Sequence, residues 1–262
     1  TAGRRVLALE PDGDPRWTLA RPRSVTDARW APSPGFRIAY REGATLRVVE
    51  GDGSPDRLLA RNVAAVAPAW LPQTGRTVLA YARADGVVRV VDVDSGAELM
   101  RTPRATRIKE LLWTPDGLLA VLTERELRLH SRRGRILERG TTRAPEGHQL
   151  LDAVALPGEQ VVYADYDAEA GATALVRAFC FGAGPCRTIG PSRIFTGPGR
   201  LQDLTLSPDA RWVVAGWPEA DQLLFLRLPP GPRVRAVDDV RREFDPGRPP
   251  RGEFPRLAGW CC

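Results

Sequence analysis

The chain has 262 residues, of which 43% are hydrophobic and 27% charged, proportions that are usual for a folded globular protein. Its formal net charge is +6, but the 38 basic residues are scattered among 32 acidic ones and form no basic segment with interleaved aromatic residues, so we predict no nucleic-acid binding. No stretch approaches the roughly 18 apolar residues of a membrane-spanning helix, and we expect no span in this chain.

The first predicted element is a hairpin at residues 5–19 (RVLALEPDGDPRWTL), where two apolar runs flank a turn rich in Pro, Asp and Gly. A repeated unit follows. In "ARWAPSPGFRIAY" a short strand ends on Trp30, and a Pro-containing turn leads into an apolar strand. In "TLRVVEGDGSPDRLL" two alternating runs flank a Gly-containing turn, which indicates an antiparallel hairpin. Each unit therefore predicts a four-stranded antiparallel sheet.

The unit recurs along the whole chain. Its clearest marker is the residue that ends the first strand of each unit, Trp30 in the first one, and we call this position the slot. Trp70 and Trp113 fill the slot in the next two units, Leu156 and Leu206 fill it in the fourth and fifth, and "FPRLAGW" at 254–260 ends on Trp260. These positions are about 40 to 54 residues apart, which is typical of the blades of a β-propeller. We place Trp30, Trp70, Trp113 and Trp260 between blades as packing residues, because one aromatic residue per repeat in the same slot is what stacked sheets require.

The predicted fold is thus all-β, a single propeller domain over residues 1–262 with four-stranded antiparallel blades. We expect six blades, or seven if sequence upstream of Thr1 is missing. Residues 5–19 resemble the outer half of a repeat and 254–260 resemble a lone first strand, so the two ends together are expected to close the ring. Five full repeats are predicted at about 22–62, 63–104, 105–147, 148–198 and 199–240, with a composite closing blade from 1–21 and 250–262.

Two pairs of cysteines stand out. Cys180 and Cys186 bracket "FGAGP", where other repeats have their hairpin turn, and we predict a disulfide between them, with a pair of buried thiols as the alternative. A disulfide would indicate an oxidising compartment. Cys261 and Cys262 are adjacent at the end of the sequence, as in a prenylation signal, but they directly follow a predicted core strand. We therefore favour a structural or exposed thiol role for them.

A ring of carboxylates is a candidate site. Asp27, Glu110 and Asp203 each lie three residues before the slot, on the innermost strands that line a propeller's channel, where they could hold a cation or a basic group. The other repeats have Ala67, Ala153 and Leu257 there, so the ring is incomplete. We favour the alternative that each carboxylate pairs with a neighbouring arginine.

Signals for catalysis, cofactors and metals are weak. The sequence contains no Gly-x-Ser-x-Gly or His-Glu-x-x-His motif, no Cys-x-x-Cys spacing and no phosphate-binding loop before a helix. Its only histidines, His130 and His148, fall on different predicted elements. We therefore predict no catalytic residues, no cofactor and no metal, and a protein that is not an enzyme.

The Trp-x-Pro-Asp-Gly stretch at 113–117, followed by an apolar strand and by hairpins that turn on "DGS" or "DSG", resembles the WD-repeat-like blades of the TolB-type β-propeller superfamily over almost the whole chain. The end of the sequence, from "GWPEADQLLFLRL" to "FPRLAGWCC", is similar to bacterial propellers that follow a membrane anchor. Leu156 and Leu206 depart from the family's pattern in the fourth and fifth repeats, where the family has Trp.

The repeat, the predicted disulfide and the lack of catalytic motifs favour a monomeric, non-catalytic module outside the cytoplasm, tethered to the cell envelope by sequence upstream of Thr1, that binds a protein or peptide with one face. The resemblance further implies the sensor half of a membrane-bound regulator, similar to an anti-sigma factor. The alternative is the accessory propeller of a larger hydrolase of the prolyl-oligopeptidase type. That alternative is disfavoured because "GWCC" follows the closing strand directly.

Overall fold

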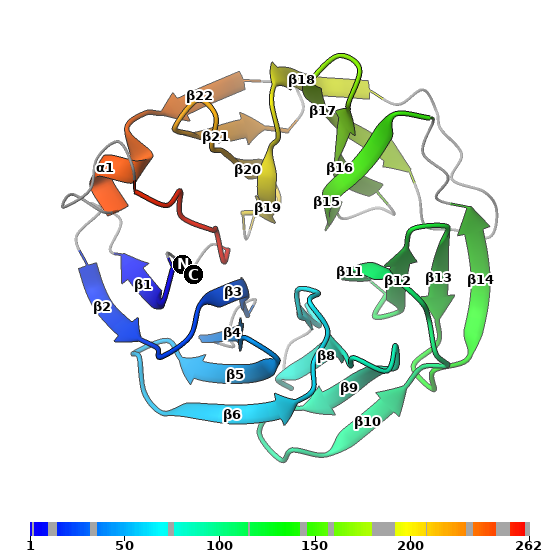
Figure 1. Ribbon diagram of the computed structural model, residues 1–262. Coiled ribbons are helices and arrows are strands. Elements are labelled where there is room, and N and C mark those ends of the chain that lie inside the picture. The colour runs from blue at the N-terminus through cyan, green and yellow to red at the C-terminus, as the bar shows by residue number, and fades with distance from the viewer. Residues whose placement is uncertain are drawn as a thin grey trace.

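The computed structural model describes residues 1, 3–9, 15–31, 36–72, 76–114, 116–141, 146–156, 160–179, 192–207, 209–228, 233–244 and 252–259. In this part of the chain, antiparallel sheets are arranged as blades around a central axis (Figure 1). The fold class expected from the sequence, an all-β propeller with four-stranded blades, is confirmed. The described helix, α1 (Val240–Phe244), has five residues, and no described helix is long and apolar enough to cross a membrane.

Five sheets have four strands each, and in each sheet the strands follow one another in chain order. We number these blades 1 to 5. Blade 1 contains β3 (Val25–Trp30), β4 (Arg37–Glu42), β5 (Thr45–Glu50) and β6 (Asp56–Arg61); blade 2 contains β7 (Ala69–Trp70), β8 (Val78–Ala82), β9 (Val88–Asp92) and β10 (Glu98–Arg101); blade 3 contains β11 (Ile108–Trp113), β12 (Leu119–Thr123), β13 (Glu126–His130) and β14 (Ile136–Thr141); blade 4 contains β15 (His148–Leu156), β16 (Gln160–Asp167), β17 (Ala172–Phe179) and β18 (Ser192–Pro198); blade 5 contains β19 (Gln202–Leu206), β20 (Trp212–Trp217), β21 (Gln222–Arg227) and β22 (Arg233–Val237).

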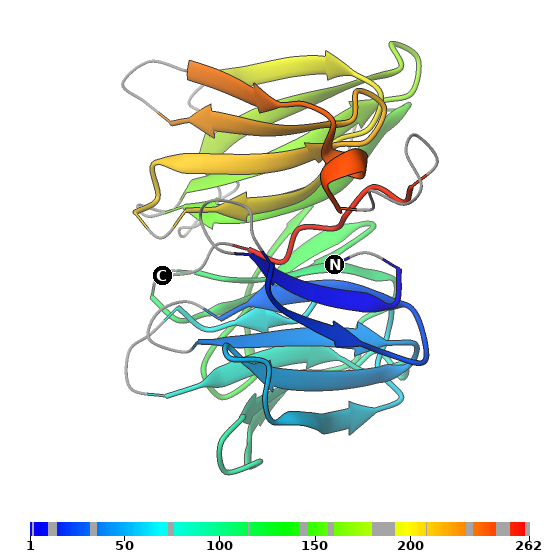
Figure 2. The same cartoon turned by 90° about the vertical axis from the view of Figure 1, so that its left-hand side faces the viewer.

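The expected number of six blades, or seven, is wrong. Besides the five blades, the described residues form one two-stranded sheet, made of β1 (Arg5–Leu9) and β2 (Pro15–Ala20). The C-terminal segment 252–259 lies beside β1 (Figure 2) but is not a strand of that sheet. Its pairing is sparse: Arg256 N–H donates to the Thr1 carbonyl, and the Ala258 carbonyl accepts from Trp30 N–H.

The sequence of this segment explains why it does not complete a blade. Pro255 has no backbone N–H to give to a ladder, and Gly259 has a φ of 134°, far from the extended conformation of a strand. Among the described residues, the terminal segments therefore supply two paired strands where a full blade has four, and the composite closing blade expected from the two ends does not form.

The core lies between neighbouring blades and inside each one. The second strands are the most buried: every residue of β8 and β12 is buried, because these strands are covered on both faces. Apolar residues of adjacent blades form shared clusters, one of which contains Val90 of blade 2 together with Leu111 and Val121 of blade 3. Equivalent clusters join blades 1 and 2 and blades 4 and 5. Each blade is thus stabilised mainly by its neighbours, as in other repeat proteins.

The two-stranded sheet is fastened to blade 1 by polar contacts. Arg21, just after β2, pairs with Asp56 at 2.7 Å and with Glu42 at 2.8 Å. The indole N–H of Trp17 donates to the Gly51 carbonyl at 2.8 Å. These contacts fix the sheet beside the turn that follows β5, where the pocket described below is found.

Candidate functional site

The channel brings the predicted carboxylates close to a fourth one. Asp27, Glu110 and Asp203 lie on the first strands β3, β11 and β19, and Asp152 lies on β15 of blade 4. In each of these four strands the pairing register shifts at or next to the acidic residue, which is the signature of a β-bulge. A bulge breaks the alternation of side chains and can turn one residue out of the plane of the sheet.

Asp152 was missed by the sequence analysis because it lies four residues before Leu156, not three. Counting three residues back leads to Ala153, whereas β15 has its register shift between Leu150 and Asp152. A search for any acidic residue within four positions of the slot would have found it.

An arginine from across the ring reaches these carboxylates. Nη2 of Arg29, on β3 of blade 1, lies 3.9 Å from Glu110 Oε1 and 3.8 Å from Asp152 Oδ1. The Arg29 side chain is 23% exposed and the two carboxylate side chains are 12% and 7% exposed. Blades 1, 3 and 4 are thus joined by one cation, which sequence reasoning did not single out because it considered only residues three before the slot.

Burial shapes the protonation of this cluster. Burial, together with the charge of Asp152, raises the pKa of Glu110 well above its ordinary value, although Arg29 opposes the shift. Burial also raises the pKa of Asp152, against the opposing charge of Arg29. For Arg29 itself burial lowers the pKa, but the carboxylates of Asp152 and Glu110 more than offset this, so its pKa is raised. The guanidinium therefore stays charged and serves as the counter-ion of the cluster.

Asp152 and Asp203 also join neighbouring inner segments through the backbone. Oδ2 of Asp152 accepts the N–H of Leu204 in the next blade at 2.7 Å. Oδ2 of Asp203 accepts the N–H of Leu257 at 3.2 Å, while Arg256 Nη2 lies 2.9 Å from its Oδ1.

Asp27, in contrast, pairs with Arg41 of its own blade. The channel carboxylates thus have partners within the chain, and this cluster is better explained as an internal ion-pair network than as an open cation site.

Two of the slot tryptophans make the same bond between blades. The indole N–H of Trp70 donates to the Arg29 carbonyl of blade 1 at 2.8 Å, and that of Trp113 donates to the Ala69 carbonyl of blade 2 at 3.0 Å. In both cases the acceptor is the residue just before the slot of the preceding blade. Both side chains are buried. This repeated bond positions each inner strand against the next.

Substituting these two tryptophans is expected to weaken the ring more than the same change in blade 1. Trp70→Phe and Trp113→Phe each leave a carbonyl between two blades without its donor and should lower the free energy of unfolding by about 2 kcal/mol. Trp30→Phe should lower it by less than about 1 kcal/mol, because no such bond is lost. Urea denaturation of the three variants measures the difference, and equal losses at all three positions would contradict the assignment.

Trp30 differs because the element before it is not a full blade. Its backbone N–H donates to the Ala258 carbonyl at 2.7 Å, but among the described residues its indole N–H has no acceptor. The side chain is only half-buried. Trp30 therefore presents to the surface both an aromatic ring and a hydrogen-bond donor. In Trp70 and Trp113 the same donor is bound to a backbone carbonyl of the preceding blade.

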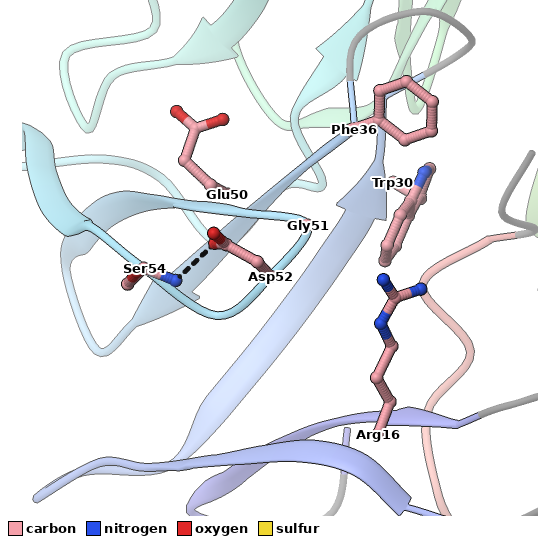
Figure 3. A pocket seen from close by; sticks show the side chains of 7 residues that line it. All are labelled: Arg16, Trp30, Phe36, Glu50, Gly51, Asp52 and Ser54. Atoms are coloured by element: carbon pink, nitrogen blue, oxygen red, sulfur yellow. Dashed lines mark hydrogen bonds between the residues drawn. The ribbon is translucent and has the colours of Figure 1, made fainter.

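Trp30 lines a pocket of about 390 Å³ on one face of the ring (Figure 3). One side of the pocket has Trp30, the half-exposed Phe36 and the guanidinium of Arg16 from β2. The other side is formed by the end of β5 and its turn, with the lining residues Glu50, Gly51, Asp52 and Ser54.

Backbone geometry and hydrogen bonds fix the second side of the pocket. A Cβ added to Gly51 would lie only 2.8 Å from the Phe36 carbonyl oxygen. Because glycine has no Cβ, the turn can approach Phe36 this closely. Oδ1 of Asp52 accepts the Ser54 N–H at 2.9 Å, and the Glu50 carboxylate accepts from Arg37 Nε. Sequence reasoning missed this pocket because it took all slot tryptophans as equivalent.

The two histidines have structural contacts. His130 is buried, and its Nδ1–H donates to the Gly134 carbonyl at 3.2 Å, while burial lowers its pKa. His148 Nδ1 lies 2.9 Å from Asp165 Oδ2. Across the ranges described above, no group of three or more His, Cys, Asp or Glu residues is arranged to hold a metal ion.

Some predicted residues cannot be placed. Cys180 and Cys186 lie outside the described residues, so the disulfide between them stays a prediction. The same holds for Trp260, Cys261 and Cys262.

Comparison with known proteins supports the fold and goes no further. No protein-family model matches the chain, and no curated protein matches its sequence. Among solved structures, the chain is similar to the β-propeller domain of Cps50 (Swd1) from Myceliophteria thermophila, with a TM-score of 0.59 and 14% identity over 85% of this chain and 75% of that one. The expectation of a WD40-like β-propeller is thereby confirmed, whereas the more specific resemblance to TolB-type propellers stays a prediction.

Proposed function

We propose that this protein is a non-catalytic binding module that docks a protein or peptide partner on the face that contains the Trp30 pocket. The observation that carries the proposal is the pocket itself. There the partly buried Trp30 and the half-exposed Phe36 lie next to polar groups of opposite charge, Arg16 on one side and Asp52 on the other. Aromatic anchors surrounded by polar groups are characteristic of binding sites.

The scaffold supports such a role. The sheet that carries Arg16 is held against blade 1 by the Trp17–Gly51 hydrogen bond and by the pairs of Arg21 with Asp56 and Glu42, so the two elements that form the pocket are fixed relative to each other. A preformed site loses less conformational entropy on binding than one that must be ordered by its ligand.

Three finer features belong to the same proposal: a monomer, a location outside the cytoplasm, and a role as the sensor part of a membrane-bound regulator. They rest on the resemblance noted above and on the predicted bond between Cys180 and Cys186, not on contacts of the described residues. The accessory-propeller alternative stays a prediction that no contact of the described residues favours.

Site-specific photo-crosslinking tests the docking face. A photoreactive amino acid is placed at Phe36, at the pocket, and in a second protein at Ala44, an exposed position at the other end of β4 in the same blade. Both proteins are irradiated in an extract of the source cells, and the adducts are identified by mass spectrometry.

The Phe36 protein is expected to give one or a few defined protein adducts that an excess of unmodified protein abolishes. The Ala44 protein is expected to lack them. If the two positions give the same adducts, or if no adduct from Phe36 is competed away, the proposal is wrong.

A further inference from the structure

We propose that the Trp30 pocket binds a basic side chain, arginine or lysine, of an extended peptide segment. This inference rests on the proposed function and adds to it the chemistry of the bound residue. It follows from three observations: an indole N–H without an acceptor among the described residues, carboxylates on the facing wall, and the placement of Arg16 on the Trp30 side, opposite Asp52.

The first observation is the indole N–H of Trp30. In blades 2 and 3 the equivalent N–H groups of Trp70 and Trp113 each donate to a backbone carbonyl supplied by the preceding blade. In blade 1 the preceding element is the C-terminal segment, and among the described residues no carbonyl takes that place. A peptide lying in the pocket would supply the same chemical group, a backbone carbonyl, that the other two tryptophans already bind.

The second observation is the charge on the opposite wall. Oδ1 of Asp52 is held by the Ser54 N–H, which orients the carboxylate, and the described residues give Oδ2 no partner. Glu50 is adjacent but shares its charge with Arg37. Asp52 is therefore the group that a cationic side chain would pair with, after its aliphatic stem has crossed the aromatic surfaces of Trp30 and Phe36.

The third observation is the position of Arg16. Its guanidinium lies on the Trp30 side of the pocket, away from Asp52 (Figure 3). Asp52 attracts a basic side chain to the opposite wall, so the peptide backbone is expected on the side of Trp30, where a carbonyl can accept the indole N–H. The volume of about 390 Å³ lies within the usual range for ligand sites and accommodates one long side chain with its flanking peptide groups.

Short blocked peptides test the inference. The probes are acetyl-Gly-Gly-Arg-Gly-Gly-amide and its counterparts with lysine, norleucine or glutamate at the centre, and affinity is measured by isothermal titration calorimetry or NMR titration with the full chain. The arginine and lysine peptides are expected to bind about tenfold or more tightly than the glutamate peptide, because opposite charges attract and like charges repel at this site. The norleucine peptide, which keeps the stem without the charge, should fall between them.

Two variants connect that preference to the pocket. Asp52→Asn keeps the acceptor for Ser54 N–H but removes the charge, and should weaken the arginine peptide about fivefold or more while leaving the norleucine peptide unchanged. Trp30→Phe should weaken both peptides to a similar degree, because both use the indole N–H.

Asp85→Asn is the matched control. Asp85 forms the same kind of turn, with its Oδ1 accepting the Val87 N–H, but it is located in the β8–β9 turn of blade 2, away from the pocket. It should leave all four affinities unchanged.

Equal affinities for the four peptides, tighter binding of the glutamate peptide, or equal effects of Asp52→Asn and Asp85→Asn would overturn the inference. Competable crosslinks from Phe36 in any of these cases would leave the docking function standing and refute only the ligand class. The absence of both crosslinks and peptide binding would refute the two together.

Discussion

Replacing Arg29 by methionine is expected to lower the free energy of unfolding by about 3 kcal/mol at neutral pH. The substitution keeps the length of the side chain but removes the cation that lies between Glu110 and Asp152. Removal of one partner from a buried ion pair is strongly destabilising, because the remaining charges stay buried without compensation. Here the remaining charges also repel each other.

The loss should depend on pH in a defined direction. Burial raises the pKa values of Glu110 and Asp152 in the folded protein, and without Arg29 these values rise further. Above the ordinary carboxyl pKa, the folded variant then holds protons that the unfolded chain has already released. Stability therefore falls as the pH rises through the raised pKa values. The destabilisation by Arg29→Met should be smallest near pH 5 and largest at pH 7 and above.

Urea denaturation at several pH values, followed by tryptophan fluorescence, measures this dependence. Glu110→Gln should partly restore stability when Arg29 is methionine, whereas alone it should not, and a double-mutant cycle gives the coupling between the two residues. Arg107→Met is the control, since Arg107 forms a solvent-exposed pair with Glu124 and should change stability little. An Arg29→Met loss that does not vary with pH would show that the cation does not balance these carboxylates.

The propeller was predictable because its signal is local and repeated. Trp30, Trp70 and Trp113 mark the end of the first strand in three successive blades, and alternating runs with Gly-containing turns mark the outer strands. The number of blades was not predictable in the same way. Whether the ends of the chain complete a blade depends on pairing between residues more than 220 positions apart, and Pro255 and Gly259 limit that pairing.

The contents of the site were only partly visible for the same reason. Counting back from the slot found Asp27, Glu110 and Asp203, because these three repeats share that spacing, whereas in blade 4 the carboxylate of Asp152 lies one position further back. Arg29 binds carboxylates of blades 3 and 4, and no spacing in the sequence shows that these residues meet. Trp30 is the same residue type in the same slot as Trp70, and only the incomplete neighbour makes it different.

Close contact between blades leads to the second large effect, at Gly134 in the β13–β14 turn. Gly134 has a φ of 78°, and a Cβ added there would lie 2.1 Å from the backbone carbonyl oxygen of Arg101 in blade 2. No backbone atom can be displaced from such a distance without moving one blade relative to the other. Gly134→Ala should therefore lower the free energy of unfolding by about 4 kcal/mol, of which about 1 kcal/mol comes from the positive φ alone.

Gly96→Ala separates the two contributions to this effect. Gly96 has a similar φ of 72° in the β9–β10 turn, but an added Cβ would meet nothing within 4 Å. This variant should lose about 1 kcal/mol, the cost of placing a non-glycine residue in the left-handed region. Thermal or urea denaturation of both variants gives the comparison. If the two losses are equal, the contact between the Gly134 turn and Arg101 does not constrain the ring, and the blades would have to be less tightly stacked than the distances indicate.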